Sequence, residues 1–139
     1  MKPGQILKGE EGFTLVEIIA VLIILGILAA VAVPRYIDLE TNAKNKAIDA
    51  GISELNGRES LVWADAKISG SNFADNAAID SSVRTRISYD LNPPGAPTPD
   101  YTWTAGPDAT SGSLSFKAAT AIPLTRIPAQ LNQPASWRR

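Results

Sequence analysis

The sequence predicts an α+β protein, in which the second half of one long N-terminal helix packs against a small antiparallel sheet. Three observations support this prediction. From Phe13 to Val33 only Thr14 and Glu17 are polar. The residues after this run carry apolar side chains at helical spacing, and short segments beyond residue 100 alternate between apolar and polar residues. The chain therefore combines an apolar helix with one small head.

The composition bounds the function. The chain has 139 residues, of which 45% are hydrophobic, so one ordered domain is expected rather than disorder. Thirteen Lys and Arg oppose fourteen Asp and Glu without a basic patch, so nucleic-acid binding has no support. The chain has no Cys for a disulfide or a thiolate nucleophile, no His for the commonest zinc or copper sites, and no Gly-rich phosphate loop. We expect no enzyme, metal or cofactor.

Residues 1–12 precede the apolar run and carry Lys2 and Lys8 without an apolar core of their own. A secretory signal would place about 7–15 apolar residues before a small-residue cleavage site, for which Ala29–Ala32 could serve, but the apolar run is long for that. A run of about 20 residues can instead span a bilayer. A plain anchor leaves Glu17 unexplained, because a carboxylate in a membrane helix costs about 2.5–3.5 kcal/mol.

The stretch Gly12-Phe13-Thr14-Leu15-Val16-Glu17, followed by apolar residues to Val33-Pro34, resembles the prepilin signature of type IV pilins and type II secretion pseudopilins. The resemblance implies that residues 1–12 are a leader, which a prepilin peptidase removes between Gly12 and Phe13. It also implies N-methylation of Phe13 and a role for Glu17 in assembly. The implied location is a single pass of the inner membrane, followed by an extracellular pilus or a periplasmic pseudopilus.

Glu17 suits this role chemically. Cleavage would create a cationic amine on Phe13 within an apolar bundle, where an unpaired charge is expensive to bury. Glu17 of a neighbouring subunit could neutralise the amine and set the axial register. Because Glu17 lies only one helical turn from Phe13, a contact within one subunit is the alternative.

Gly26 and Pro34 fall inside the predicted transmembrane and assembly helix, residues 13–34. Proline costs about 3 kcal/mol in a helix interior, so we expect a kink near Pro34. The resemblance implies that the stretch from Gly26 to Pro34 can loosen when subunits enter a filament. An ordinary tolerated kink is the alternative.

An amphipathic helix is predicted to continue over residues 35–70 and to stop at Ser69-Gly70-Ser71. Its apolar face is formed by Ile37, Ile48, Ile52, Leu55, Val62 and Ala66, with Lys44, Asp49, Ser53 and Glu54 between them. Leu61, Val62 and Trp63 form a bulky cluster at its end, which we expect to pack in the core.

The remaining head, residues 71–139, should contain a short helix from Asp75 to Ser88 with Ile79, Val83 and Ile87 on one face. Arg84 and Arg86 would then form a solvated face, or bind acidic residues of a neighbour. The Pro-rich segment 92–99 must be a loop, because its four prolines remove backbone donors. Strands are expected at Tyr101–Thr104, at Leu114–Ala118 and at Leu124–Ile127, with an exposed loop at Gly106–Gly112.

The leading interpretation is a structural subunit of a type IV pilus-like filament. Its partners would be further copies of itself, the prepilin peptidase and an inner-membrane assembly platform. A pseudopilin of type II secretion is the alternative, although Pro34-Arg35-Tyr36-Ile37-Asp38-Leu39 resembles the post-anchor region of mannose-sensitive-haemagglutinin-type pilins and favours a pilus.

The sequence is compatible with two other functions of the head. A minor adhesin or tip subunit could present Tyr101, Trp103 or Trp137 to a ligand, but aromatic residues in small strands are usually core. Asp100 and Asp108 could bind calcium with loop carbonyls, but they lack regularly spaced oxygen ligands.

Overall fold

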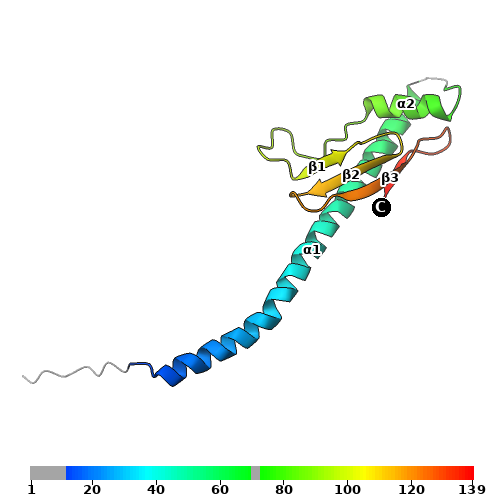
Figure 1. The fold of residues 1–139 in the computed structure, drawn as a ribbon. Coiled ribbons are helices and arrows are strands. Elements are labelled where there is room, and N and C mark those ends of the chain that lie inside the picture. Colours follow the sequence, from blue (N-terminus) through cyan, green and yellow to red (C-terminus); the bar gives the residue numbers. More distant parts are fainter. Residues whose placement is uncertain (1–11, 70–72) are drawn as a thin grey trace, which may run out of the picture. The chain divides into compact units, whose positions relative to one another are not determined.

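The computed structural model describes residues 12–69 and 73–139 and has the α+β architecture expected from the sequence (Figure 1). The long helix α1 covers Leu15–Ile68, and α2 covers Asn76–Arg86. The strands are β1 Tyr101–Ala105, β2 Ser111–Phe116, β3 Ile122–Ile127 and β4 Ser136–Arg138. The chain divides into an N-terminal unit that ends at Glu40 and a head unit, Thr41–Arg139.

The four strands form one antiparallel sheet in the order β1-β2-β3-β4, so each strand pairs with its neighbour in sequence. Three of these strands were expected from the sequence, and β4 was not. Gly112 was expected in an exposed loop, but it is buried in β2, where a Cβ would lie 2.6 Å from the ring of Trp103. This glycine therefore serves close packing rather than a turn.

The turn between β2 and β3 begins earlier than expected. Ala118 was placed in a strand, but Lys117 and Ala118 have φ angles of 49° and 54°, in the left-handed region. Two consecutive left-handed residues reverse the chain after Phe116 and end the strand there. The alternation of Leu114, Phe116 and Ala118 in the sequence does not indicate that the chain turns at Lys117.

One face of α1 packs on the sheet, as predicted, although two residues expected to be buried are exposed. Ile48, Leu55 and Ala66 are buried, and Ile52 and Val62 are half-buried. Leu61 was expected in the core and Ile37 on the same face, but they are 72% and 57% exposed. Leu61 lies two positions from the buried Glu59, which at 3.6 residues per turn places it on the opposite side of the helix.

The aromatic side chains of the strands are core residues. Trp137 is only 2% exposed, and Tyr101 and Trp103 are half-buried around it. The rings of Trp103 and Trp137 lie 5.4 Å apart, and Tyr89 meets both edge-on. These contacts fill the space between α1 and the sheet with large apolar groups.

Helix α2 begins at Asn76 because Asp75 caps it: the Asp75 carboxylate accepts a hydrogen bond from the Ala78 N–H at 2.8 Å. Its apolar face is buried as predicted, through Ile79, Val83 and the flanking Ile87. Arg84 and Arg86 are exposed, and Arg86 forms an ion pair with Asp65 of α1 at 3.2 Å.

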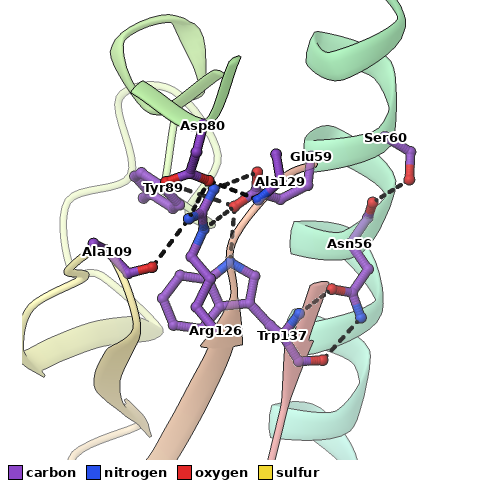
Figure 2. Close-up of polar contacts among 9 residues, drawn as sticks. All are labelled: Asn56, Glu59, Ser60, Asp80, Tyr89, Ala109, Arg126, Ala129 and Trp137. Atoms are coloured by element: carbon purple, nitrogen blue, oxygen red, sulfur yellow. Dashed lines mark hydrogen bonds and ion pairs between the residues drawn. The ribbon is translucent and has the colours of Figure 1, made fainter. Parts of the chain in front are cut away.

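A charged cluster lies in the middle of this core (Figure 2). Arg126 of β3 is 1% exposed and forms two hydrogen bonds with the carboxylate of Glu59 on α1, at 2.7 and 3.0 Å. Its third contact is with Asp80 of α2 at 2.8 Å, and its fourth is the Ala109 carbonyl at 3.0 Å. Burial opposes the charge on Arg126, but the hydrogen bonds and charge of Glu59 outweigh it and raise the pKa of the guanidinium.

The two carboxylates of the cluster are also bound by other elements. Glu59 accepts hydrogen bonds from the indole N–H of Trp137 at 3.1 Å and from the Tyr89 hydroxyl at 3.4 Å. Asp80 accepts one from the Ala129 N–H at 2.7 Å. Among the described residues, no buried polar side-chain atom lacks a hydrogen-bond partner. Buried charged groups are tolerated in a protein core when their polar atoms all have hydrogen-bond partners, as they do here.

On each edge strand of the sheet, one residue has its backbone N–H and carbonyl bound by an asparagine side chain. Asn92, at the start of the Pro-rich loop, accepts from the Tyr101 N–H at 2.8 Å and donates to its carbonyl at 2.9 Å. Asn56 of α1 does the same for the N–H and carbonyl of Trp137 in β4. Each amide replaces the backbone of a missing neighbouring strand, which limits pairing with other chains at these positions.

We predict that Arg126→Met destabilises the head by about 3–5 kcal/mol, because Glu59 and Asp80 would stay buried without their counter-charge. The measurement is urea unfolding of the fragment that begins at Arg35, which we expect to fold cooperatively because the head has its own core. The exposed Arg84→Met is the matched control and should change the free energy of unfolding by less than about 0.5 kcal/mol. Equal small effects of both substitutions would contradict a stabilising cluster.

We also predict a loss of head stability between pH 10 and 12 that depends on Tyr89. Burial, and then the charge of Glu59, raise the pKa of Tyr89 from 10.0 to about 12. The folded head therefore keeps the phenol proton after the unfolded chain has lost it, so this contribution is complete below pH 10 and disappears as the pH rises to 12. After allowance for partial exposure we expect about 1–2 kcal/mol.

The measurement compares the free energy of unfolding at pH 9 and pH 11.5 for the parent and for Tyr89→Phe. The parent should lose more stability than the variant over this interval. Parallel pH profiles would show that Tyr89 titrates normally.

Candidate assembly site

The N-terminal half of α1 exposes its apolar side chains along its whole length. Every residue from Phe13 to Val33 is exposed, including Leu15 at 76% and Val16 at 74%. By length and composition, α1 is the one helix in the described part of the chain that could cross a membrane. Such a surface is unfavourable in water and needs a lipid or protein environment.

Thr14 and Glu17 form a capping box at the start of this helix. The Thr14 hydroxyl accepts a hydrogen bond from the Glu17 N–H at 3.2 Å. The Glu17 carboxylate reaches back and accepts bonds from the backbone N–H and the hydroxyl of Thr14, both at 2.8 Å. These reciprocal bonds satisfy amide donors that a helix N-terminus leaves unpaired, and they fix the start of α1 at Leu15.

The capping role of Glu17 was not predicted from the sequence, where Glu17 was expected only to act in assembly. The signal was present, because Thr14 and Glu17 are spaced as Thr-x-x-Glu directly before an apolar run. The contact also means that the carboxylate keeps hydrogen-bond partners within its own chain, which lowers the cost of placing it in an apolar environment.

Gly12 and Phe13, the predicted cleavage site, precede the helix and are exposed. They lie in a segment without regular secondary structure, which a peptidase can bind more easily than a helix. The rest of the predicted leader lies outside the described residues. An amine on Phe13 would belong to the residue directly before Thr14, so it would be created beside the capping box.

Gly26 and Pro34 both lie inside the continuous helix α1. A Cβ at Gly26 would meet no atom within 4 Å, so no contact in the isolated chain requires a glycine there. Glycine costs up to about 1 kcal/mol relative to alanine in a helix interior. The proposed loosening of this stretch stays a prediction.

The surroundings of Asp100 and Asp108 do not favour calcium binding. Asp100 forms an ion pair with Lys117 at 3.9 Å, and the Asp108 N–H donates to the Ser111 carbonyl at 2.7 Å. Within residues 12–69 and 73–139, no three His, Cys, Asp or Glu side chains gather as a metal site.

Comparison with known proteins supports the same interpretation. The family model described as the prokaryotic N-terminal methylation motif matches residues 7–33. The chain is 31% identical to the type IV narrow pilus major component PilA5 of Thermus thermophilus over 110 residues, which cover 79% of this chain and 83% of that protein. It is also 31% identical to two fimbrial proteins of Pseudomonas aeruginosa over 102 residues, 64% of this chain and 65% of each. No solved structure matches the chain significantly.

The N-terminal motif and the relative that covers most of the chain agree with the exposed apolar helix and the small antiparallel head. The chain belongs to the type IV pilin family.

Proposed function

We propose that this chain is a structural subunit of a type IV pilus-like filament and polymerises through the apolar run from Phe13 to Val33. The observation that carries this proposal is the complete exposure of that run on a helix of a pilin-family chain. In the membrane the run already lies among lipid tails, so close helix packing and paired polar groups would drive association there. Once the subunit leaves the bilayer, the same apolar surface stays out of water only if other copies cover it.

The capping box supports a specific version of the assembly step. Both bonds from Thr14 end on Oε2 of Glu17. A carboxylate can accept on both oxygens, so Oε1 can bind the Phe13 amine of a neighbouring subunit while the capping box persists. The same side chain would then fix the start of its own helix and the register of the next subunit.

Processing and location follow from this assignment. The prepilin peptidase would cut between Gly12 and Phe13, and the new amine of Phe13 would be N-methylated. The subunit would wait in the inner membrane as a single-pass protein until an assembly platform moves it into an extracellular pilus. Two features favour a pilus over a secretion pseudopilus or an adhesin: the relatives are named as pilus and fimbrial proteins, and Tyr101, Trp103 and Trp137 pack in the core of the head.

We predict that the mature protein begins at Phe13, where the charged leader meets the apolar helix. Intact-mass measurement of purified filaments should give residues 13–139, with one added methyl group. A mass that retains the first twelve residues, or a cut near Ala32, would overturn the proposed processing.

We predict that Glu17→Ala leaves the subunit in the membrane but strongly reduces its incorporation into filaments. Insertion becomes easier because a costly polar group is removed. Assembly suffers because each incoming amine would be buried without its counter-charge, at a cost of several kcal/mol per subunit. The measurement compares the membrane fraction with sheared filaments when the variant is the only copy.

Two further variants sharpen this experiment. Glu17→Gln keeps the shape and most hydrogen bonds but removes the charge, so an intermediate defect assigns the larger part to electrostatics. Glu54→Ala, an exposed carboxylate on the head part of α1, is the control and should assemble normally. Normal assembly of Glu17→Ala would refute the proposed mechanism.

A further inference from the structure

Arg35 and Tyr36 follow the apolar run of α1 almost directly. Arg35 is the first charged residue after Glu17, and only Pro34 separates it from Val33, the last residue of the run. Both side chains are exposed, that of Tyr36 to 74%. Neither the guanidinium nor the phenol has a hydrogen-bond or ion-pair partner among the described residues. Both polar groups are therefore available to the surroundings of the helix.

The length of the run sets the level of these two residues in a bilayer. About 20 helical residues are about 30 Å long, which is the thickness of the hydrocarbon core. The helix continues without a break past Arg35 and Tyr36, so their position along it is fixed. In a subunit that spans the membrane with Phe13 at one surface, Arg35 and Tyr36 lie in the headgroup layer of the other surface.

Both side-chain types suit this layer. Tyrosine is enriched at membrane–water interfaces, because its ring is apolar and its hydroxyl needs a polar partner. A guanidinium can bind a phosphate through two parallel hydrogen bonds, while its apolar stem lies along the acyl chains. The acidic residues Asp38 and Glu40, which phosphates repel, come only after Arg35 and Tyr36. The innermost charge on this side of the run therefore has the sign that attracts phosphate.

We propose that Arg35 and Tyr36 bind the phospholipid headgroups on the side of the bilayer away from the leader, and thereby fix the depth of the unassembled subunit. The proposal rests on the membrane-spanning state of the proposed function and adds the lipid contact that positions it. Arg35 donates hydrogen bonds to phosphate oxygens. The ring of Tyr36 lies at the boundary of the acyl chains, with its hydroxyl among the headgroups.

This depth also decides how Glu17 is placed before assembly. Glu17 precedes Arg35 by about 27 Å along the helix, so it lies close to the opposite surface of the hydrocarbon core. A charged side chain near the end of a membrane helix can reach the interface, which lowers its cost. An anchor at Arg35 and Tyr36 therefore keeps Glu17 out of the bilayer centre while the subunit waits in the membrane.

A single spin label can measure this depth, because the chain has no cysteine of its own. Leu28→Cys places the label at an exposed position two turns before Arg35. The full chain is reconstituted into vesicles of phosphatidylethanolamine and phosphatidylglycerol. The depth follows from the collision rates of the label with oxygen, which concentrates among acyl chains, and with a water-soluble nickel chelate. In the parent the label should lie about 10 Å below the level of Arg35.

Arg35→Ala combined with Tyr36→Ala extends the apolar segment to Ile37. The helix should then sink or tilt, and the label should move at least about 3 Å deeper. Arg35→Lys combined with Tyr36→Trp should keep the parent depth, because lysine and tryptophan also favour the interface. The matched control, Asp38→Ala with Leu39→Ala, replaces two exposed side chains farther from the run and should leave the depth unchanged. An unchanged depth in the first variant, or an equal shift in the control, would overturn the proposal.

Depth and filament formation are measured separately, so the two proposals can fail separately. If the label in the parent lies at the expected depth but the parent forms no filaments, the filament function fails and the lipid contact stands. If the parent assembles but Arg35→Ala with Tyr36→Ala keeps the parent depth, the lipid contact is wrong and the function stands. If this variant keeps the depth and loses its filaments, the two residues contact a second copy instead of lipid, and the proposal is also wrong.

Discussion

The hydrogen-bonded cluster around Arg126 is the interaction on which the head depends. It joins four elements through three charged side chains: α1 through Glu59, α2 through Asp80, β3 through Arg126 itself, and β4 through the indole of Trp137. A small head without cysteines has no covalent constraint on its C-terminal strand. Because the carboxylates and the guanidinium can all be satisfied only when these elements meet in one arrangement, the cluster selects that arrangement over other ways of packing a helix on a sheet.

The N-terminal unit differs from the head, because its apolar side chains are exposed in the isolated chain. Only a bilayer or other protein chains can remove them from water. From Phe13 to Val33 the only polar side chains are Thr14 and Glu17, and these two form hydrogen bonds with each other. Head and helix can therefore form independently: the head by burying its own core, and the helix by entering a bilayer or a bundle of other copies. This independence suits a subunit that must be stable both before and after assembly.

The sequence predicted the features that depend on local periodicity and failed where distant residues decide. The apolar run, the helical face through Ile48 and Leu55, the α2 face and three of the strands follow from spacing alone. Strand β4 has only three residues and pairs through register with β3, so no alternation could reveal it. The burial of Glu59 and Arg126 was unpredictable for the same reason: charged residues are normally exposed, and the two partners lie 67 positions apart. The wrong placement of Leu61 follows from that omission, since the buried face passes through Glu59.

Two carboxylates on one helix show how the same chemical group serves folding and assembly. Glu59 is fully buried and its charge is compensated by Arg126 of the same chain, so it contributes to the fold as soon as the head forms. Glu17 is exposed, and its bonds to Thr14 satisfy hydrogen-bonding capacity but not charge. An uncompensated charge on an apolar helix is a cost in every state except one in which an opposite charge arrives. In our proposal that charge is the Phe13 amine, which exists only after the leader is removed. The ion pair that stabilises the assembled state can therefore form only between processed subunits.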